Sequence, residues 1–352
     1  MKPFIYQSLP SRVVFGRGSI QQLAAEVDRL GANKVLILCT PQQRGLAQMA
    51  IEILGAKAVG IYDQAVMHVP IETAAAARER AAQLGADTCL AIGGGSTIGL
   101  GKAIALTSDL PIIAVPTTYA GSEMTPIYGI TEAGLKKTGR DLRVLPKTVI
   151  YDPELLITLP ASIAGPSGMN AIAHSVEALY AQDANPIISL MAEESIRALG
   201  KSLPKLIAKP DDLEAISEAL YGAWLAGVCL GAVGMAIHHK LCHTLGGTFN
   251  LPHAEMHTIV LPHSVAYNRD AAPEAMAKIC RALGTDDAAT GLYDLAKSLG
   301  ASMALKEIGM PANGIEVAAK LATQNPYFNP RPIEKSAIQT LLDDAYSGRR
   351  PA

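Results

Sequence analysis

The first half of the chain alternates short apolar segments with segments of helical periodicity. Apolar segments typical of buried strands lie at 35–39, 58–62, 88–92 and 112–115. Between them, one helical segment runs from Pro70 to about Leu84 and another covers 97–107. Strands that alternate with helices over short connections predict a parallel sheet with helices on both faces.

The pattern changes near Leu159. Residues 127–150 predict a hairpin-like excursion from the sheet, and from Ser162 onward almost only helical periodicity remains. We therefore predict an α/β domain over 1–160 and an all-helical domain over 161–352. The apolar segment 223–237 is too short to span a bilayer and is interrupted by glycines, so we expect a buried core helix there.

Composition narrows the class of protein. Of the 352 residues, 49% are apolar and 18% are charged, which is typical of a soluble protein with buried helices and an oligomer interface. The net charge is −2 and no basic run is present, so neither a nucleic acid nor a membrane is an expected partner. Five scattered cysteines without a CxxC motif indicate reduced thiols, and we expect a cytoplasmic protein without a signal peptide.

A glycine-rich turn follows the third of these strands. Its glycines allow a close approach of backbone to ligand, and the helix that follows offers free N–H groups to a pyrophosphate. It is neither the GxGxxG fingerprint nor a Walker loop. The next strand also ends in a polar loop, at the same edge of the sheet, which favours nucleotide binding over a purely structural turn. The candidate nucleotide-binding residues are Gly93, Gly94, Gly95, Ser96, Thr117, Thr118 and Ser122.

Histidines cluster in the second half of the chain. Six of the eight lie between His238 and His263. Imidazole ligates metals and transfers protons near neutral pH. On helices, His239 and His243 share one face, and so do Asn170 and His174. We therefore predict a site to which two helix faces contribute. Glu123 and Glu177 are expected to be cap or ion-pair groups, and four histidines are expected to be surface or hydrogen-bonded structural residues: His68, His238, His257 and His263.

Five motifs occur in an order that resembles the iron-containing alcohol dehydrogenase superfamily. They are GGGS, the PTT–GSE loop, IYDPELLITLP, GMNAIAHSVEALY and HHKLCHTLGG–LPHAEMHTIVLPH. Within the superfamily, GGGSTIGLGKAIAL and PTTYAGSEMTPIYGITE are most similar to the maleylacetate reductases. The resemblance extends from FGRGS to NPRP. It implies an N-terminal dinucleotide-binding domain, a helical catalytic domain, an active site between them and a homodimer.

The resemblance also implies roles for individual residues. The pyrophosphate contacts map onto Gly93–Ser96, the nucleotide contacts onto Thr117 and Thr118, and a ribose or phosphate contact onto Lys136 or Lys137. The histidine beside the nicotinamide maps onto His243. The superfamily's metal ligands map onto Asn170, His174, His239 and His253.

Two departures from the superfamily pattern concern the cofactors. Thr40 stands where an acidic residue often binds the ribose 2′-hydroxyl, so repulsion of the 2′-phosphate is absent and both NADH and NADPH are expected. Asn170 stands where the superfamily has an aspartate ligand. The ligand set thereby loses its only anion, which weakens the affinity for a divalent ion.

The loss of the aspartate favours one kind of chemistry. Alcohol dehydrogenation needs a Lewis acid, whereas reduction of an enone double bond produces an enolate that hydrogen bonds or an imidazolium can stabilise. We therefore expect metal-independent reduction of maleylacetate, a dicarboxylate enone, to 3-oxoadipate. Asn170 and Arg331 are candidate substrate contacts. His243 or His253 is the expected proton donor within the histidine cluster, and Tyr327 is the next candidate.

Three other functions remain open at this point. One is a metal-dependent alcohol or polyol dehydrogenase, which chelation would inactivate. Another is a lyase similar to dehydroquinate synthase, which regenerates its NAD and shows no net consumption of NADH. The third is a non-catalytic nucleotide-binding sensor whose metal site has decayed.

Overall fold

The computed structural model describes residues 3–132 and 135–352, and the side chains of residues 135 and 136 lie outside this description. The chain divides into two compact units. One unit is Ser8–Leu159, and the other combines the N-terminal segment through Gln7 with Pro160–Ala352.

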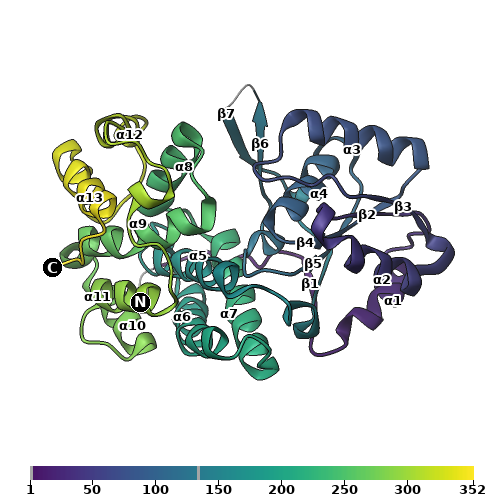
Figure 1. The fold of residues 1–352 in the computed structure, drawn as a ribbon, viewed down its shortest axis with the longest axis horizontal. Helices are drawn as coiled ribbons and strands as arrows, with labels where there is room; N and C mark the ends of the chain where they lie inside the picture. The colour runs from purple at the N-terminus through teal and green to yellow at the C-terminus, as the bar shows by residue number, and fades with distance from the viewer. Residues whose placement is uncertain (1–2, 133–134) are drawn as a thin grey trace. The chain divides into compact units, whose positions relative to one another are not determined.

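The first unit contains a six-stranded, wholly parallel sheet (Figure 1). Its strand order is β1-β8-β5-β4-β2-β3. The strands are β1 (Arg12–Phe15), β2 (Val35–Leu38), β3 (Ala58–Tyr62), β4 (Thr88–Gly93), β5 (Ile112–Pro116) and β8 (Thr148–Tyr151). The four strands expected from the apolar segments are confirmed to within a residue.

The excursion expected over 127–150 is only partly correct. Strands β6 (Ile127–Glu132) and β7 (Leu135–Arg140) do form an antiparallel hairpin. However, β8 returns to the main sheet between β5 and β1, and β1 was not expected at all. All four residues of β8 are buried, so the strand lacks the polar alternation that would distinguish it in the sequence.

Helices cover both faces of this sheet. They are α1 (Leu23–Arg29), α2 (Arg44–Leu54), α3 (Ile71–Leu84) and α4 (Gly95–Ser108). Val35 and Ile37 point into the core beneath α1 and α2, whereas Leu36 and Leu38 point into the core beneath α3 and α4. This alternation within one strand of four buried residues explains its continuous apolar run.

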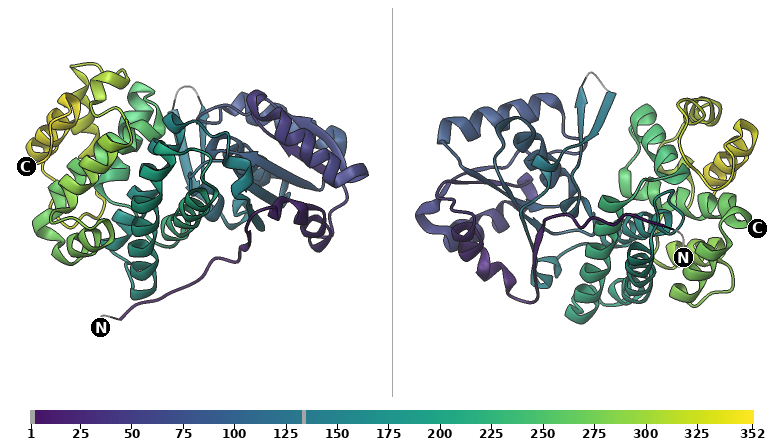
Figure 2. Two further views of the ribbon diagram at one scale, coloured as in Figure 1. Left: turned by 60° about the horizontal axis from the view of Figure 1, so that its bottom comes forward. Right: turned by 180° about the vertical axis from the view of Figure 1, so that it is seen from behind.

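The second unit is helical, and residues 160–352 contain no strand (Figure 2). Its helices are α5 (Ala161–Leu179), α6 (Pro186–Ala208), α7 (Leu213–Ala232), α8 (Ile237–Phe249), α9 (His253–Asn268), α10 (Pro273–Leu283), α11 (Ala288–Ser298), α12 (Gly314–Ala322) and α13 (Lys335–Ser347). Helix α5 is buried from Ala164 to Leu179, although Asn170, His174 and Glu177 lie within that stretch. Such deeply buried polar groups need partners, and the N-terminal part of α8 supplies them.

Helix α7 corrects the expectation for residues 223–237. The helix begins ten residues earlier, has 20 residues and ends at Ala232, so it is long and apolar enough to cross a bilayer. The length of the helix therefore does not exclude a membrane span, contrary to the sequence-based expectation. The expected core position is supported instead by burial, because 61% of its most apolar window is buried inside the protein.

Candidate active site

The glycine turn lies at the carboxyl end of β4. Gly93 has a φ of +156°, and a Cβ there would lie 2.5 Å from Thr97 Oγ1 and 2.6 Å from Gln43 Oε1, so no larger residue fits. Gly94 is the N-cap of α4, and among the described residues no side chain caps that helix. The first N–H groups of α4 are thus left for an anion such as a pyrophosphate. The turn therefore fits the dinucleotide that the sequence predicts.

Gln43 connects the loops around this turn. Its Nε2 donates to Thr117 Oγ1 at 2.7 Å, and Thr40 Oγ1 donates to its Oε1 at 3.2 Å. The Thr117 backbone N–H also donates to the Gly93 carbonyl at 3.1 Å. Thr40, Gly93 and Thr117 therefore gather at one edge of the sheet, as the sequence predicts. Gln43 itself was missed, although its polar side chain follows the end of β2 closely.

Lys102 is a second residue that sequence reasoning missed. It is buried in α4, and its Nζ donates to the carbonyls of Ser122, Thr125 and Ile127 at 2.6, 2.8 and 2.7 Å. Burial lowers the pKa of Lys102 to about 7, and the charge of Glu123 opposes that shift. The lysine holds the Ser122 loop against the helix of the glycine turn. Its signal in the sequence is a single charge in an otherwise apolar helix.

The two lysines expected near the nucleotide lie on the β6–β7 hairpin. Lys137 is exposed and forms an ion pair with Glu132 on the neighbouring strand. The side chain of Lys136 lies outside the described residues. A role of either lysine in binding the cofactor remains a prediction.

Four buried side chains of the helical unit form one hydrogen-bonded chain, which we call the carboxylate network. Asn170 Nδ2 lies 3.3 Å from His174 Nε2, His174 Nδ1 lies 2.8 Å from His239 Nε2, and His239 Nδ1 lies 2.7 Å from Glu177 Oε2. None of the four residues is more than 5% exposed. The predicted pairing of the Asn170–His174 face with the His239 face is confirmed.

Glu177 also caps helix α8. Its Oε1 accepts from the His238 backbone N–H at 2.7 Å, and its Oε2 accepts from the Ala236 N–H at 2.9 Å. A carboxylate at a helix N-terminus is stabilised by the exposed N–H groups and by the helix dipole. The cap role expected from the sequence is confirmed, but the contact with His239 was not foreseen.

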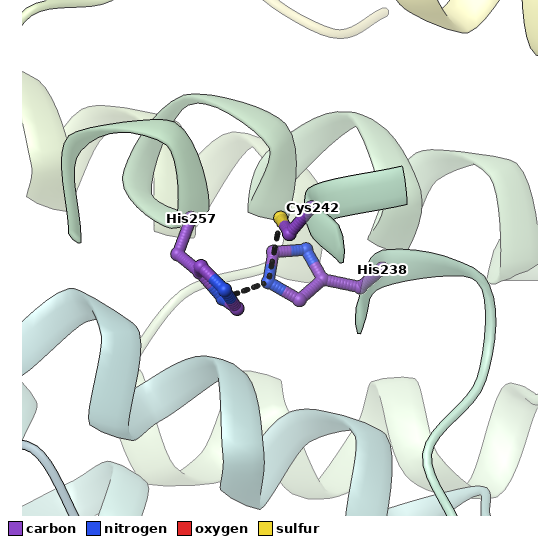
Figure 3. Close-up of side chains that lie close together, drawn as sticks. All are labelled: His238, Cys242 and His257. Atoms are coloured by element: carbon purple, nitrogen blue, oxygen red, sulfur yellow. Dashed lines mark hydrogen bonds between the residues drawn. The ribbon is translucent and has the colours of Figure 1, made fainter. Parts of the chain in front are cut away.

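A second chain, the hydroxyl network, consists of Ser264, His238 and His257. His238 Nδ1 lies 3.2 Å from Ser264 Oγ, and His238 Nε2 lies 2.9 Å from His257 Nδ1 (Figure 3). Both histidines are completely buried, and burial together with neighbouring imidazoles lowers the pKa of each well below its usual value. The expectation of hydrogen-bonded structural residues is confirmed for this pair.

The hydroxyl network also contains a group that could hold a metal ion. Cys242 Sγ lies 3.7 Å from His238 Nε2, and one ligand atom from each of Cys242, His238 and His257 falls within 4.8 Å of the others (Figure 3). Burial raises the pKa of the Cys242 thiol well above its usual value, and the nearby Glu177 raises it further. A metal here would have to displace that proton and the hydrogen bond between the two imidazoles.

The four positions that correspond to the superfamily's metal ligands fit a divalent ion poorly. Within the carboxylate network, His239 Nε2 already faces His174 Nδ1, and the Asn170 amide nitrogen faces His174 Nε2. The one carboxylate of the network, Glu177, faces the N-terminus of α8 and His239 Nδ1. The position that is an aspartate in the superfamily therefore carries an uncharged amide, and the imidazole nitrogens His174 Nδ1 and His239 Nε2 face each other.

The two candidate proton donors are more open than the carboxylate network. His243 is exposed, and its ring centroid lies 6.2 Å from that of His239, one turn earlier on α8. His253 is half-buried at the start of α9, with its ring centroid 4.3 Å from that of His257. The structure thus places both histidines beside the buried networks, and their role as proton donors remains a prediction.

Two residues from the C-terminal part of the chain complete the set of candidates. Tyr327 is half-buried, and Lys240 Nζ lies 5.6 Å from its ring centroid. Burial raises the pKa of Tyr327, so its phenol retains a proton to donate. Arg331 is exposed and stacks 4.3 Å from the ring centroid of Tyr267. Contact of Tyr327 or Arg331 with a substrate remains a prediction.

A parallel-sheet unit with an open glycine turn, followed by a helical unit with buried histidines, defines a class of dinucleotide-binding dehydrogenases. The chain belongs to the iron-containing alcohol dehydrogenase family. The family model for iron-containing alcohol dehydrogenase matches residues 10–153, and the C-terminal model of the same family matches residues 165–346. The resemblance inferred from the motifs is confirmed.

Individual relatives point to a narrower group within the family. The chain is 58% identical to the maleylacetate reductases of Burkholderia cepacia and Sphingobium indicum, covering 100% of both chains in the first comparison and 99% in the second. Among solved structures, the maleylacetate reductase of Agrobacterium tumefaciens matches with a TM-score of 0.96 and 51% identity, covering 100% of each chain. The similarity therefore includes both units.

Proposed function

We propose that the chain is an oxidoreductase that reduces the carbon–carbon double bond of maleylacetate to give 3-oxoadipate, with NADH or NADPH as the reductant. The observation that carries this proposal is the 58% identity with maleylacetate reductases over the full length. The open N-terminus of α4 beside Gly93 supports the dinucleotide, and the gathered histidines support the proton transfer.

The residues of the helical unit supply the acid and the binding groups. A bound reduced nicotinamide would provide the hydride, which adds to the carbon β to the ketone. The resulting enolate is stabilised by hydrogen bonds from imidazole N–H groups, and His253 or His243 returns a proton to the carbon α to the ketone. The two substrate carboxylates need cationic or N–H partners, and the candidates are the exposed Arg331 guanidinium and the imidazoles of His243 and His253.

The proposal includes turnover without a metal ion. Its support is the composition of the carboxylate network, in which Asn170 stands in the place of an anionic ligand and His174 Nδ1 and His239 Nε2 face each other. Enone reduction needs only hydrogen-bond donors at the enolate oxygen, whereas a polyol dehydrogenase must stabilise an alkoxide. We further propose a cytoplasmic homodimer that binds neither nucleic acid nor membrane.

A single assay separates this function from its rivals. Purified protein is mixed with NADH and maleylacetate, and the absorbance of NADH is followed with and without a chelator. Consumption that the chelator leaves unchanged supports the proposal. Consumption of NADH that the chelator abolishes would favour a metal-dependent dehydrogenase, and product formation without net loss of NADH would identify a lyase. Binding of NADH without any turnover would identify a sensor.

The choice of cofactor gives a first mutational prediction. Thr40→Asp places a negative charge where a 2′-phosphate would lie, so we expect kcat/KM for NADPH to fall by at least about tenfold and that for NADH by less than about threefold. Thr40→Asn is the control, because asparagine has the size of aspartate without its charge. Unchanged NADPH kinetics in the aspartate variant would show that the ribose is recognised elsewhere.

A further inference from the structure

We infer that Arg44 determines how well the protein uses NADPH, because its guanidinium offers the 2′-phosphate a cationic partner and neutralises Asp63, a carboxylate at the same edge of the sheet. Both residues lie in the first unit, where they form an ion pair with each other. The inference deepens the proposed function, since it rests on the use of a dinucleotide. It does not depend on the reduction of maleylacetate.

The order of the strands places this ion pair next to the glycine turn. Strands β4, β2 and β3 are neighbours in that order, and the glycine turn follows β4 (Figure 1). Thr40 follows the end of β2, Arg44 begins α2, and Asp63 directly follows β3. In dinucleotide-binding sheets, an acidic residue beyond the glycine turn binds the ribose 2′-hydroxyl, and an arginine nearby accommodates a 2′-phosphate. The edge at β2 and β3 is therefore the expected place for the ribose of the adenosine half.

Contacts within the edge connect the ion pair with Thr40. Gln43, the residue before Arg44, accepts a hydrogen bond from Thr40 Oγ1 at 3.2 Å. Burial raises the pKa of the Cys39 thiol to about 11, the charge of Asp63 raises it further, and the charge of Arg44 opposes the rise. Both charges thus act on the residue directly before Thr40. A group bound at Thr40 lies within the electrostatic reach of both.

Arg44 has the position and the free donors that a phosphate requires. It is the first residue of α2, and the first turn of that helix contains no acidic residue and no side-chain cap among the described residues. A positive charge there opposes the helix dipole, whereas an anion is stabilised by it. The Arg44 side chain is 64% exposed, and its ion pair with Asp63 is made through Nη1. A guanidinium has five N–H donors, so others remain for a phosphate.

Asp63 supplies the negative charge that Arg44 neutralises. Its Oδ1 accepts from Gln64 Nε2 at 2.9 Å, and its Oδ2 accepts from Arg44 Nη1. The hydrogen bonds from Gln64 and Arg44 lower the pKa of Asp63, which favours the carboxylate. The edge therefore does contain an acidic residue, one strand beyond the position of Thr40. Without Arg44, this carboxylate would repel a 2′-phosphate and accept a hydrogen bond from a 2′-hydroxyl.

Substitutions of the two residues should shift the use of NADPH in opposite directions. Arg44→Gln removes the cation and leaves Asp63 without its partner, so kcat/KM for NADPH should fall by at least about tenfold and that for NADH by less than about threefold. Asp63→Asn removes the repulsion, so kcat/KM for NADPH should rise by at least about threefold. The double variant should fall between the two. An unchanged ratio of NADPH to NADH use in both single variants would overturn the inference.

The matched control is Lys57→Gln. Lys57 follows the opposite end of α2 and forms an ion pair with Asp28, so this variant loses the same charge from the same unit. We expect it to leave the ratio of NADPH to NADH use within about twofold, because its charge is far from the glycine turn along α2 and is screened by salt. A shift equal to that of Arg44→Gln would show that net charge, and not the position of Arg44, sets the preference.

Binding without maleylacetate separates this inference from the proposed reaction. Fluorescence titration of NADH and NADPH, which differ only in the 2′-phosphate, measures both affinities without turnover. Arg44→Gln should weaken NADPH by at least about tenfold and NADH by less than about threefold, and Arg44→Lys should retain part of the NADPH affinity because it keeps the charge without the planar fork. Added salt should weaken NADPH more than NADH in the wild type and equally in Arg44→Gln.

The outcomes of the titration are distinct. An equal loss of affinity for NADH and NADPH in Arg44→Gln would assign Arg44 to a part that both cofactors share and would overturn the inference. Unchanged affinity for NADPH would overturn it as well. The expected pattern in a protein that does not reduce maleylacetate would support the role of Arg44 and contradict the proposed function alone.

Discussion

The two imidazole networks of the helical unit have similar nitrogen–nitrogen distances and different anchors. The imidazole nitrogens approach to 2.8 Å in the carboxylate network and to 2.9 Å in the hydroxyl network. The first ends on the carboxylate of Glu177. The second ends on Ser264, whose only hydroxyl hydrogen is donated to the Leu261 carbonyl at 2.9 Å. Distances between rings therefore do not distinguish the two networks, whereas the charge at the anchor does.

This difference indicates where chemistry is expected. Burial and neighbouring imidazoles lower the pKa of His238 and His257, which favours the neutral form of both. The carboxylate network contains a fixed negative charge that can compensate positive charge as it develops on an imidazole during proton transfer. We therefore assign the hydroxyl network to the stability of the fold and the carboxylate network to the reaction.

The largest effect on kcat is expected from substitutions at two adjacent residues of α8, which belong to different networks. His239→Phe removes a link to Glu177 and should lower kcat by about 100-fold, which is within the range of a positioned acid–base group. His238→Phe removes a link to Ser264 and should change kcat by less than about fivefold, because the group is structural. Steady-state kinetics on both variants, with thermal unfolding as a control for folding, would test this. Equal losses of kcat would remove the distinction between the networks.

A smaller effect on kcat is expected at His243 and His253, which lie beside the two networks. His243→Ala and His253→Ala should each lower kcat by at least about tenfold while the affinity for NADH changes little, because a proton donor acts on the substrate after hydride transfer. NADH fluorescence titration measures the affinity, and stopped-flow absorbance measures the turnover. Wild-type kcat in both variants would direct attention to Tyr327, for which Tyr327→Phe is the corresponding test.

The smallest effect concerns stability and sharpens the argument about neutral imidazoles. Burial lowers the pKa of His263 to about 4, with Asp344 opposing the shift. Because the folded pKa lies below the unfolded value near 6.5, the unfolded state binds more protons between these values. The contribution of His263 to the free energy of unfolding is therefore present above pH 6.5. It is lost as the pH falls towards 4, by up to about 1.4 kcal/mol per pH unit. His263→Gln should flatten this dependence in urea unfolding measured from pH 7 to pH 4. An unchanged slope would assign the acid sensitivity to other groups.

Much of the first unit could be predicted because its signals are local. Strand β4, the glycine turn and helix α4 are consecutive in the chain, so the apolar run, the glycines and the helical periodicity identify the nucleotide edge together. Strand β1 was missed because only Val14 of its four residues is buried, and β8 was missed because its place in the sheet depends on pairing with β5 and β1, which are distant in the sequence. Lys102 was missed for a related reason, since the carbonyls that surround it come from a different loop.

The histidine site shows what the amino-acid sequence by itself determined and what the tertiary structure decided. The spacing of Asn170 with His174 and of His239 with His243 placed each pair on one helix face, because helical periodicity is a property of consecutive residues. The chemical state of those side chains depends on contacts over 65 residues from His174 to His239 and over 62 residues from Glu177 to His239. Which carboxylate lies buried against which imidazole is a property of the assembled fold, and no local pattern encodes it.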